Sequence, residues 1–426
     1  MDSLDYTPLR LRKNEERRLL AGHAWVFSNE VDIAATPIKD LTPGQPVLIE
    51  DHRGKAIGTG YANPQSLICA RLVSRDKAHP FNASLLVHRL KVALSLRERL
   101  FTEPCYRLAY GESDGLPGLV VDRYGDVLVA QVTTAGMEVM QDAILEALHK
   151  AVHPKAVLWR NDSPVRELEG LDLYMRPALG EVPETVTLTE HGARFHAPLL
   201  SGQKTGWFFD QRDNRAWLAR VSRGMKVLDL FSYVGAWGVQ AALNGAESVT
   251  CVDASGDALE SMAANAAENG VGDRVSGVKG DAFEVLKQLR EDQARFDVVI
   301  TDPPAFIKRR KDVKEGTAAY RRLNQMAMQV MAKDGLLIAC SCSQHLEAAS
   351  LEAQLWGAAR HVDRSLQILC PGRPGPGPSR PPGHAGDRLP QGGAVPGGTG
   401  MIQNSRFKVQ DSKSWFGLSS APVFES

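Results

Sequence analysis

The C-terminal half of the chain consists of short apolar runs that alternate with segments of helical spacing. The apolar runs, each expected to form a strand, are KVLDLF (226–231), SVTCVDA (248–254), FDVVITD (296–302) and GLLIACS (335–341). Apolar strands between amphipathic helices are typical of a parallel sheet that is covered on both faces. Because crossovers between parallel strands are almost always right-handed, residues 187–370 are predicted to form a doubly wound α/β domain.

The N-terminal part of the chain has a different pattern. Residues 1–74 alternate apolar with polar positions and contain Pro-Gly, Arg-Gly and Asn-Pro turns, which predicts a small β-barrel. Residues 81–101 carry leucines at helical spacing, and two apolar strands around an Arg-Tyr-Gly-Asp turn follow them. We therefore expect a middle α+β domain over residues 75–186.

The last segment, residues 371–426, resembles neither part. Between Pro371 and Gly400 lie eight of the 24 prolines and ten of the 38 glycines. A segment with so few large apolar side chains cannot offset the entropy of ordering by burial, so a disordered tail is predicted.

Composition narrows the class of protein. The 426 residues include 50 Lys+Arg and 50 Asp+Glu, so a generally basic nucleic-acid coat is excluded although local basic patches are not. No run approaches the roughly 20 apolar residues of a membrane span, and the N-terminus lacks the apolar stretch of a secretory signal. None of the six cysteines forms a CxxC pair. We therefore expect no metal site and a reducing, cytoplasmic location.

A nucleotide site is predicted at the turn after the first strand of the α/β domain. Ligands of open α/β sheets bind at the carboxyl ends of the strands, and here Asp229, Phe231 and Gly235 lie at such an end. The turn is not GxGxxG, which disfavours a pyrophosphate-binding dehydrogenase. One glycine turn preceded by an acidic residue suits a ligand with a positive centre and no phosphate, such as S-adenosyl-L-methionine (SAM).

Two further carboxylates follow the next strands. Asp253 ends the second strand, where it can accept the ribose hydroxyl protons, and Asp281 follows the third, within reach of an adenine amino group. A single aspartate at a strand end is as often a helix N-cap. Three in register, with Asp229, favour a bound cofactor over three caps.

The fourth strand ends in Asp302-Pro303-Pro304-Ala305-Phe306. Two prolines cannot continue a ladder, so the carboxylate is held in a rigid turn, and this pattern is characteristic of methyltransferases that act on nucleobases. Phe306 is expected to stack on a base while Asp302 bonds its polar edge. Lys308 and Arg309, with the two cations that follow, are expected phosphate contacts, the alternative being a solvated charge run.

The fifth strand ends in Cys340-Ser341-Cys342. Carbon 5 of a pyrimidine becomes nucleophilic only after a thiolate adds to carbon 6, so a cysteine near Asp302 suits methylation at carbon 5. In a strand both cysteines share a face, and Cys342 is favoured as the nucleophile because it is nearer the carboxyl end. The alternative is that both are small core residues.

These features together resemble the family of large-subunit ribosomal RNA cytosine-C5 methyltransferases, of the large-subunit methyltransferase I type. The matching segments are GHAWVFSNEV (22–31), GESDGLPGLVVDRYGD (111–126), GQKTGWFFDQRDNR (202–215), VLDLFSYVGAWG (227–238), DPPAF (302–306) and CSCSQH (340–345). The resemblance implies a PUA barrel, an α+β middle domain and a Rossmann-like class I methyltransferase domain. It also implies SAM-dependent methylation of a cytosine in 23S rRNA, free or in a large-subunit precursor, with Lys204, Phe208 and Gln211 as candidate SAM contacts.

The C-terminus departs from the family, which ends in a strand inserted between the fifth and sixth strands of the sheet. Without that strand, residues 364–370 would lack a partner and the fifth strand would expose an edge, which makes a homodimer plausible. Our hypothesis is a reading-frame shift near codon 370, which resequencing of the gene would test. We expect such a chain to be less stable than a relative with the usual ending.

Two other functions remain open at this point. One is a SAM-dependent nucleobase N-methyltransferase in which Cys340 and Cys342 are structural. The other is an RNA-binding relative that kept the fold and lost turnover.

Overall fold

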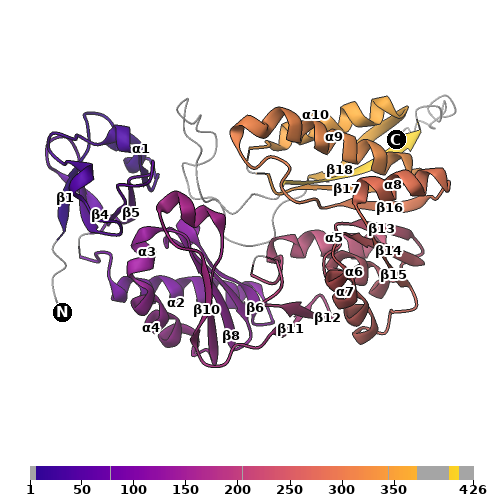
Figure 1. The fold of residues 1–426 in the computed structure, drawn as a ribbon, viewed down its shortest axis with the longest axis horizontal. Helices are drawn as coiled ribbons and strands as arrows, with labels where there is room; N and C mark the ends of the chain where they lie inside the picture. The colour runs from indigo at the N-terminus through magenta and orange to yellow at the C-terminus, as the bar shows by residue number, and fades with distance from the viewer. Residues whose placement is uncertain (1–5, 77, 204, 344, 372–402, 412–426) are drawn as a thin grey trace, which may run out of the picture. The chain divides into compact units, whose positions relative to one another are not determined.

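The computed structural model describes residues 6–76, 78–203, 205–343, 345–371 and 403–411. The chain forms two compact units (Figure 1). The first contains Met1–Leu188 and Ala197–Phe209, and the second contains Thr189–His196 and most of the chain from Asp210 onward. Within the described residues, no helix is both long enough and apolar enough to cross a membrane.

The first unit begins with a five-stranded sheet of order β1-β3-β4-β5-β2. Its strands are β1 (Thr7–Arg10), β2 (Trp25–Val26), β3 (Pro46–Glu50), β4 (Ala56–Ala62) and β5 (Ala70–Ser74), with α1 (Glu16–Leu20) between β1 and β2. The β3–β4 turn contains Gly54 at a φ of +81°, a conformation that L side chains rarely adopt. Val47, Ile49 and Leu72 lie in the core of this sheet.

A second five-stranded sheet, of order β10-β9-β8-β7-β6, follows in the same unit. Its strands are β6 (Cys105–Tyr110), β7 (Leu119–Tyr124), β8 (Val127–Val132), β9 (Ala156–Asn161) and β10 (Tyr174–Leu179). Its helices are α2 (Ala83–Leu100), α3 (Ala135–Val139) and α4 (Gln141–Val152). The leucines at helical spacing in α2 explain its core face: Leu86 and Leu90 are buried, and Asn82 caps the helix by accepting a hydrogen bond from the Leu85 N–H. A two-stranded sheet of β11 (Thr185–Glu190) and β12 (Ala193–Pro198) completes the path to the second unit.

The second unit contains a seven-stranded sheet of order β15-β14-β13-β16-β17-β19-β18. Its strands are β13 (Lys226–Leu230), β14 (Ser248–Asp253), β15 (Val275–Lys279), β16 (Phe296–Thr301), β17 (Met331–Ser341), β18 (Arg364–Pro371) and β19 (Gln403–Asp411). The strands from β13 to β17 are parallel, as the apolar runs predict, and β19 runs antiparallel to both of its neighbours. This confirms the predicted Rossmann-like α/β fold.

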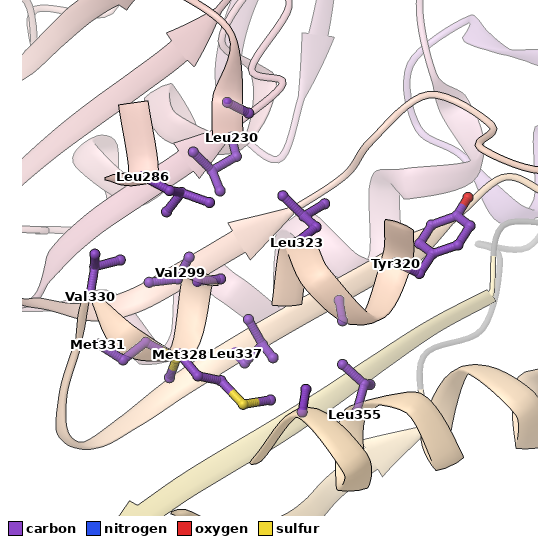
Figure 2. Close-up of a cluster of buried hydrophobic side chains, with 14 of the residues drawn as sticks. Leu230, Leu286, Val299, Tyr320, Leu323, Met328, Val330, Met331, Leu337 and Leu355 are labelled. Carbon is purple, nitrogen blue, oxygen red and sulfur yellow. The ribbon is translucent and has the colours of Figure 1, made fainter. Parts of the chain in front are cut away.

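Helices connect these strands and supply the rest of the core. They are α5 (Arg212–Val221), α6 (Ala236–Leu243), α7 (Gly256–Glu268), α8 (Ala282–Glu291), α9 (Val313–Gln329) and α10 (Ala348–His361). Figure 2 shows the cluster in which Leu230, Val299 and Leu337 of the sheet face Leu323 and Met328 of α9 and Leu355 of α10. Complete burial of such side chains contributes roughly 1.5–3 kcal/mol each before the entropy of ordering is counted.

The C-terminal segment differs from its prediction. Residues 403–411, expected to be disordered, form β19, which pairs with β17 on one side and with β18 on the other. The expected exposed edge on β17 and the expected unpartnered strand at 364–370 are therefore wrong. The sheet gains a strand from a distant segment, which was predicted to be disordered together with the Pro/Gly-rich stretch before it. The remainder of the predicted tail, 372–402 and 412–426, lies outside the described residues.

We expect a proline at position 407 to destabilise the second unit. Phe407 lies opposite Leu337 of β17 and Ile368 of β18, and a proline there removes a backbone donor from the middle of the sheet. The loss should be about 2 kcal/mol, or roughly 4–8 °C in melting temperature. Phe407→Val keeps the N–H and is the control. Equal melting curves for Phe407→Pro and Phe407→Val would contradict the pairing of β19.

Candidate active site

The turn after β13 has an unusual backbone. Phe231 and Tyr233 have φ angles of 61° and 49°, and Gly235 has 81°, so three of five consecutive residues are left-handed. A non-glycine residue in this conformation costs on the order of 1–2 kcal/mol. The turn is held by its own hydrogen bonds: the Ser232 N–H donates to the Val252 carbonyl, and the Tyr233 N–H donates to Asp253. Strain that is held in this way is common where a backbone must fit a ligand.

Asp229 lies beneath this turn and is completely buried. Its Oδ2 accepts the Gly238 N–H at 3.1 Å, whereas Oδ1 has no hydrogen-bond partner among the residues that the structure describes. Burial, and then the negative charges of Asp302 and Asp253, raise the pKa of Asp229 well above its usual range. Converging carboxylates of this kind favour a positively charged ligand, because a cation relieves both the repulsion and the unpaired acceptor.

Asp253 and Asp281 lie at the ends of the next two strands. The Asp253 carboxylate accepts N–H groups from Tyr233 and Ser255, each at 2.9 Å, so it holds the turn after β13. Asp281 is exposed and caps α8 by accepting from Phe283 at 2.9 Å and Glu284 at 3.3 Å. The structure therefore shows Asp281 as a helix N-cap, which was the alternative to cofactor binding for a single aspartate at a strand end.

Asp302 follows β16 and is oriented by two neutral donors. Trp237 Nε1 donates to its Oδ2 at 3.1 Å, and Gln211 Nε2 lies 3.2 and 3.4 Å from its two oxygens. The Gln211 amide is completely buried, and its Oε1 accepts from Asn214. Gln211, a predicted cofactor contact, thus bonds the predicted catalytic carboxylate. Trp237 was not predicted, and the only signal for it was an indole two residues after the glycine turn.

The two cysteines at the carboxyl end of β17 lie in different environments. Cys340 is completely buried within β17, opposite Asn404 of β19, and burial followed by the charge of Asp302 raises its pKa well above the usual range. Cys342 lies just beyond the strand and is half-buried. Its Sγ is 3.6 Å from the Pro303 carbonyl oxygen, which brings this thiol to the Asp302–Phe306 loop.

The remaining predicted substrate contacts divide into packed and exposed residues. The Phe306 ring contacts Tyr320 at a centroid distance of 4.8 Å and lies 6.3 Å from Phe283. Lys308 and Arg309 are exposed, and Arg309 Nε lies 3.2 Å from Asp312, whose pKa this pairing lowers.

Two further predicted cofactor contacts stay predictions. Phe208 is half-buried within the first unit, and Lys204 lies outside the described residues.

Comparisons with known families cover most of the described chain. Residues 9–75 match a PUA-like domain, and residues 172–361 match an S-adenosylmethionine-dependent methyltransferase domain. The cofactor is therefore SAM, and the buried acidic cluster around Asp229 fits its positive charge.

Solved structures share this fold, and curated relatives share the sequence over most of its length. A SAM-dependent methyltransferase from Streptococcus mutans superposes with a TM-score of 0.75 at 21% identity over 94% of this chain and all of that one. A methyltransferase solved with SAH gives 0.76 at 22% identity and the same coverage. Two proteins named ribosomal RNA large subunit methyltransferase I, from Salmonella arizonae and Klebsiella pneumoniae, are each 34% identical. The alignments cover 86% of this chain and 91% and 92% of those proteins. With its PUA-like domain, its methyltransferase sheet and this identity over nearly the full length of its relatives, the chain belongs to the ribosomal RNA large subunit methyltransferase I family.

Proposed function

We propose that this protein methylates carbon 5 of a cytosine in 23S ribosomal RNA, with Cys342 as the covalent nucleophile. The observation that carries the proposal is the half-buried thiol at the tip of β17, 3.6 Å from the loop that bears Asp302. Cys340 is a poorer candidate, because complete burial favours its neutral thiol over the thiolate that must attack.

The chemistry follows from the reactivity of the pyrimidine ring. The Cys342 thiolate forms a bond to carbon 6, and the electron pair of the C5–C6 double bond moves onto carbon 5. When bound, SAM supplies an electrophilic methyl group for that carbon. A base then removes the proton from carbon 5, the electron pair of that C–H bond re-forms the double bond, and the thiolate leaves. Asp302, held by Trp237 and Gln211, is positioned to bond the amino edge of the ring.

The residues proposed to hold SAM are those of the strained turn and its carboxylates. Asp229 offers an unpaired buried acceptor, and Phe231 and Gly235 shape the backbone around it. Asp253 is already bound to two backbone donors, but each carboxylate oxygen has a second lone pair with which to accept a ribose hydroxyl. The exposed Lys308 and Arg309 are proposed phosphate contacts for the RNA.

Ribosomal RNA is proposed as the partner on the strength of the relatives' names and the PUA-like domain. The decisive assay uses 23S rRNA transcribed with cytidine that carries tritium at carbon 5. Methylation at carbon 5 releases that tritium to water in proportion to methyl transfer from SAM. Methyl transfer without tritium release would favour the N-methyltransferase, and no transfer at all would favour an inactive RNA-binding relative.

SAM affinity is expected to rise with pH. The pKa of Asp229 is raised in the free protein, and a bound cation favours its ionised form, so binding releases a proton. Between the ordinary carboxyl pKa and the raised one, the association constant should increase by up to about tenfold per pH unit. Calorimetric titration of SAM at several pH values measures this.

Two controls accompany that titration. Asp229→Asn should flatten the pH dependence, and methylthioadenosine, which has no positive charge, should show little of it in the natural protein. A SAM affinity that does not change with pH would contradict the role of Asp229.

A further inference from the structure

Ser343 directly follows the proposed nucleophile, and its side chain is buried at 1% exposure. Its Oγ accepts the Ile307 N–H at 3.0 Å and shares a hydrogen bond of 2.8 Å with the Tyr320 hydroxyl. Ile307 is the residue after the Asp302–Phe306 loop. One hydroxyl therefore joins the tip of β17, the end of this loop and helix α9.

Tyr320 reaches Ser343 from the edge of the core. Its side chain is completely buried, and Figure 2 shows it at one end of the hydrophobic cluster with its hydroxyl directed away from Leu323. The ring centroids of Tyr320 and Phe306 are 4.8 Å apart, so Tyr320 contacts the loop with its ring and bonds Ser343 with its oxygen. Burial raises its pKa, so this hydroxyl keeps its proton in the hydrogen bond at neutral pH.

Helix α9 also lies directly against the loop. A Cβ on Gly316 would be 2.4 Å from Ile307 Cγ1 and 2.7 Å from the Phe306 carbonyl oxygen, so only glycine permits this approach. Glycine inside a helix costs about 1 kcal/mol relative to alanine. Its presence at this contact indicates that close packing of the loop on the helix outweighs that cost.

The loop thus meets the tip of β17 at two consecutive residues, the proposed nucleophile and the residue after it. Pro303 lies by the Cys342 Sγ, and Ile307 is bonded to the next residue, Ser343. Attack on carbon 6 requires near-attack geometry, and a displacement of about 1 Å can cost roughly a hundredfold in rate. The position of Sγ relative to Asp302 therefore depends on how this loop is held.

We propose that Ser343 and Tyr320 form a clamp that sets the position of Cys342 relative to the Asp302–Phe306 loop. Both are positioning residues, since they act through the nucleophile and the loop. The inference rests on the proposed function, because it assumes that Cys342 attacks the base. It adds two uncharged residues to which the sequence alone assigned no role, although Ser343 lies within the CSCSQH segment (340–345).

The test measures single-turnover methylation of 23S rRNA by the full-length protein with saturating SAM. Ser343→Ala and Tyr320→Phe should each lower the first-order rate constant by at least about tenfold and leave the reaction amplitude unchanged. The double variant should be no slower than the slower single variant, because the two hydroxyls act as one unit. Ser261→Ala is the matched control, since its Oγ donates to the Asp257 carbonyl within its own helix, α7.

The possible results are distinguishable. A role in stability alone would lower the amplitude, through loss of folded protein, and leave the rate constant unchanged, which would overturn the clamp. Natural rate constants in both variants, together with an inactive Cys342→Ala, would overturn the clamp and leave the proposed function standing. Full activity of Cys342→Ala would overturn the proposed function itself.

Discussion

Replacing Cys342 with alanine is expected to lower methyl transfer by at least about a thousandfold, because loss of the nucleophile removes the covalent route. The effect should fall on the rate, and SAM binding should be retained. Cys342 is half-buried at the end of β17, so the change leaves little cavity and the melting temperature should move little.

A covalent trap tests the same residue without turnover. RNA that contains 5-fluorocytidine has no removable proton at carbon 5, so the thioether to carbon 6 persists after methylation. The natural protein should form an adduct that survives denaturing electrophoresis and requires SAM, and Cys342→Ala should form none.

Cys340→Ala is the comparison variant. Cys340 is fully buried in β17, so the variant should lose about 1 kcal/mol of stability. It should keep the ability to form the adduct. Loss of the adduct in Cys340→Ala with its retention in Cys342→Ala would exchange the two assignments. Full methyl transfer by both variants would mean that neither thiol attacks.

Replacing Asp302 with asparagine is the second large effect that we expect. Asparagine keeps the shape but loses the charge, and the rate should fall by about 10²–10³-fold, as when a positioned hydrogen-bonding group is lost from an active site. Trp237 Nε1 and Gln211 Nε2 both donate hydrogen bonds to this carboxylate. In asparagine an NH₂ group replaces one of the two carboxylate oxygens, so one of these donors would face another donor. Steady-state methyl transfer with SAM affinity measured in parallel checks this.

Two variants separate charge from orientation. Trp237→Phe keeps an aromatic ring and removes one donor, so it should lower the rate by about tenfold, less than Asp302→Asn. Asp297→Asn, at the opposite end of β16, retains the oxygen that accepts the Lys226 N–H and should leave the rate unchanged. Natural activity in Asp302→Asn would remove this carboxylate from the mechanism.

Local pattern was enough to predict most of the methyltransferase sheet. Apolar runs identify β13, β14, β16 and β17, and each run ends in the residues that the fold brings to one edge of the sheet. This works because strand direction in a parallel sheet fixes which end of each strand meets its neighbours, whatever the connecting helices do. The turn at Gly235 and the turn at the prolines after Asp302 could also be predicted, because the backbone conformation of glycine and proline is a local property.

Contacts between distant segments could not be predicted from the sequence. Gln211 and Trp237 reach Asp302 from 91 and 65 residues away, and β19 enters the sheet from beyond a Pro/Gly-rich stretch. The segment QNSRFKVQD has two alternating apolar residues, Phe407 and Val409, which is too short a pattern to predict a strand, and its pairing depends on the edges that β17 and β18 present. Such pairing is decided by tertiary structure after local propensity has been satisfied.

The two cysteines illustrate the division most clearly. Alternation in a strand determines from sequence alone that Cys340 and Cys342 share a face, and it goes no further. Tertiary packing makes them different, because Cys340 is completely buried within β17, whereas Cys342 lies past the last paired residue of that strand, beside Pro303. The sequence by itself therefore determined most of the sheet and the residue types at its edge, and only the packing of remote segments decided that Cys342 is the more exposed of the two thiols.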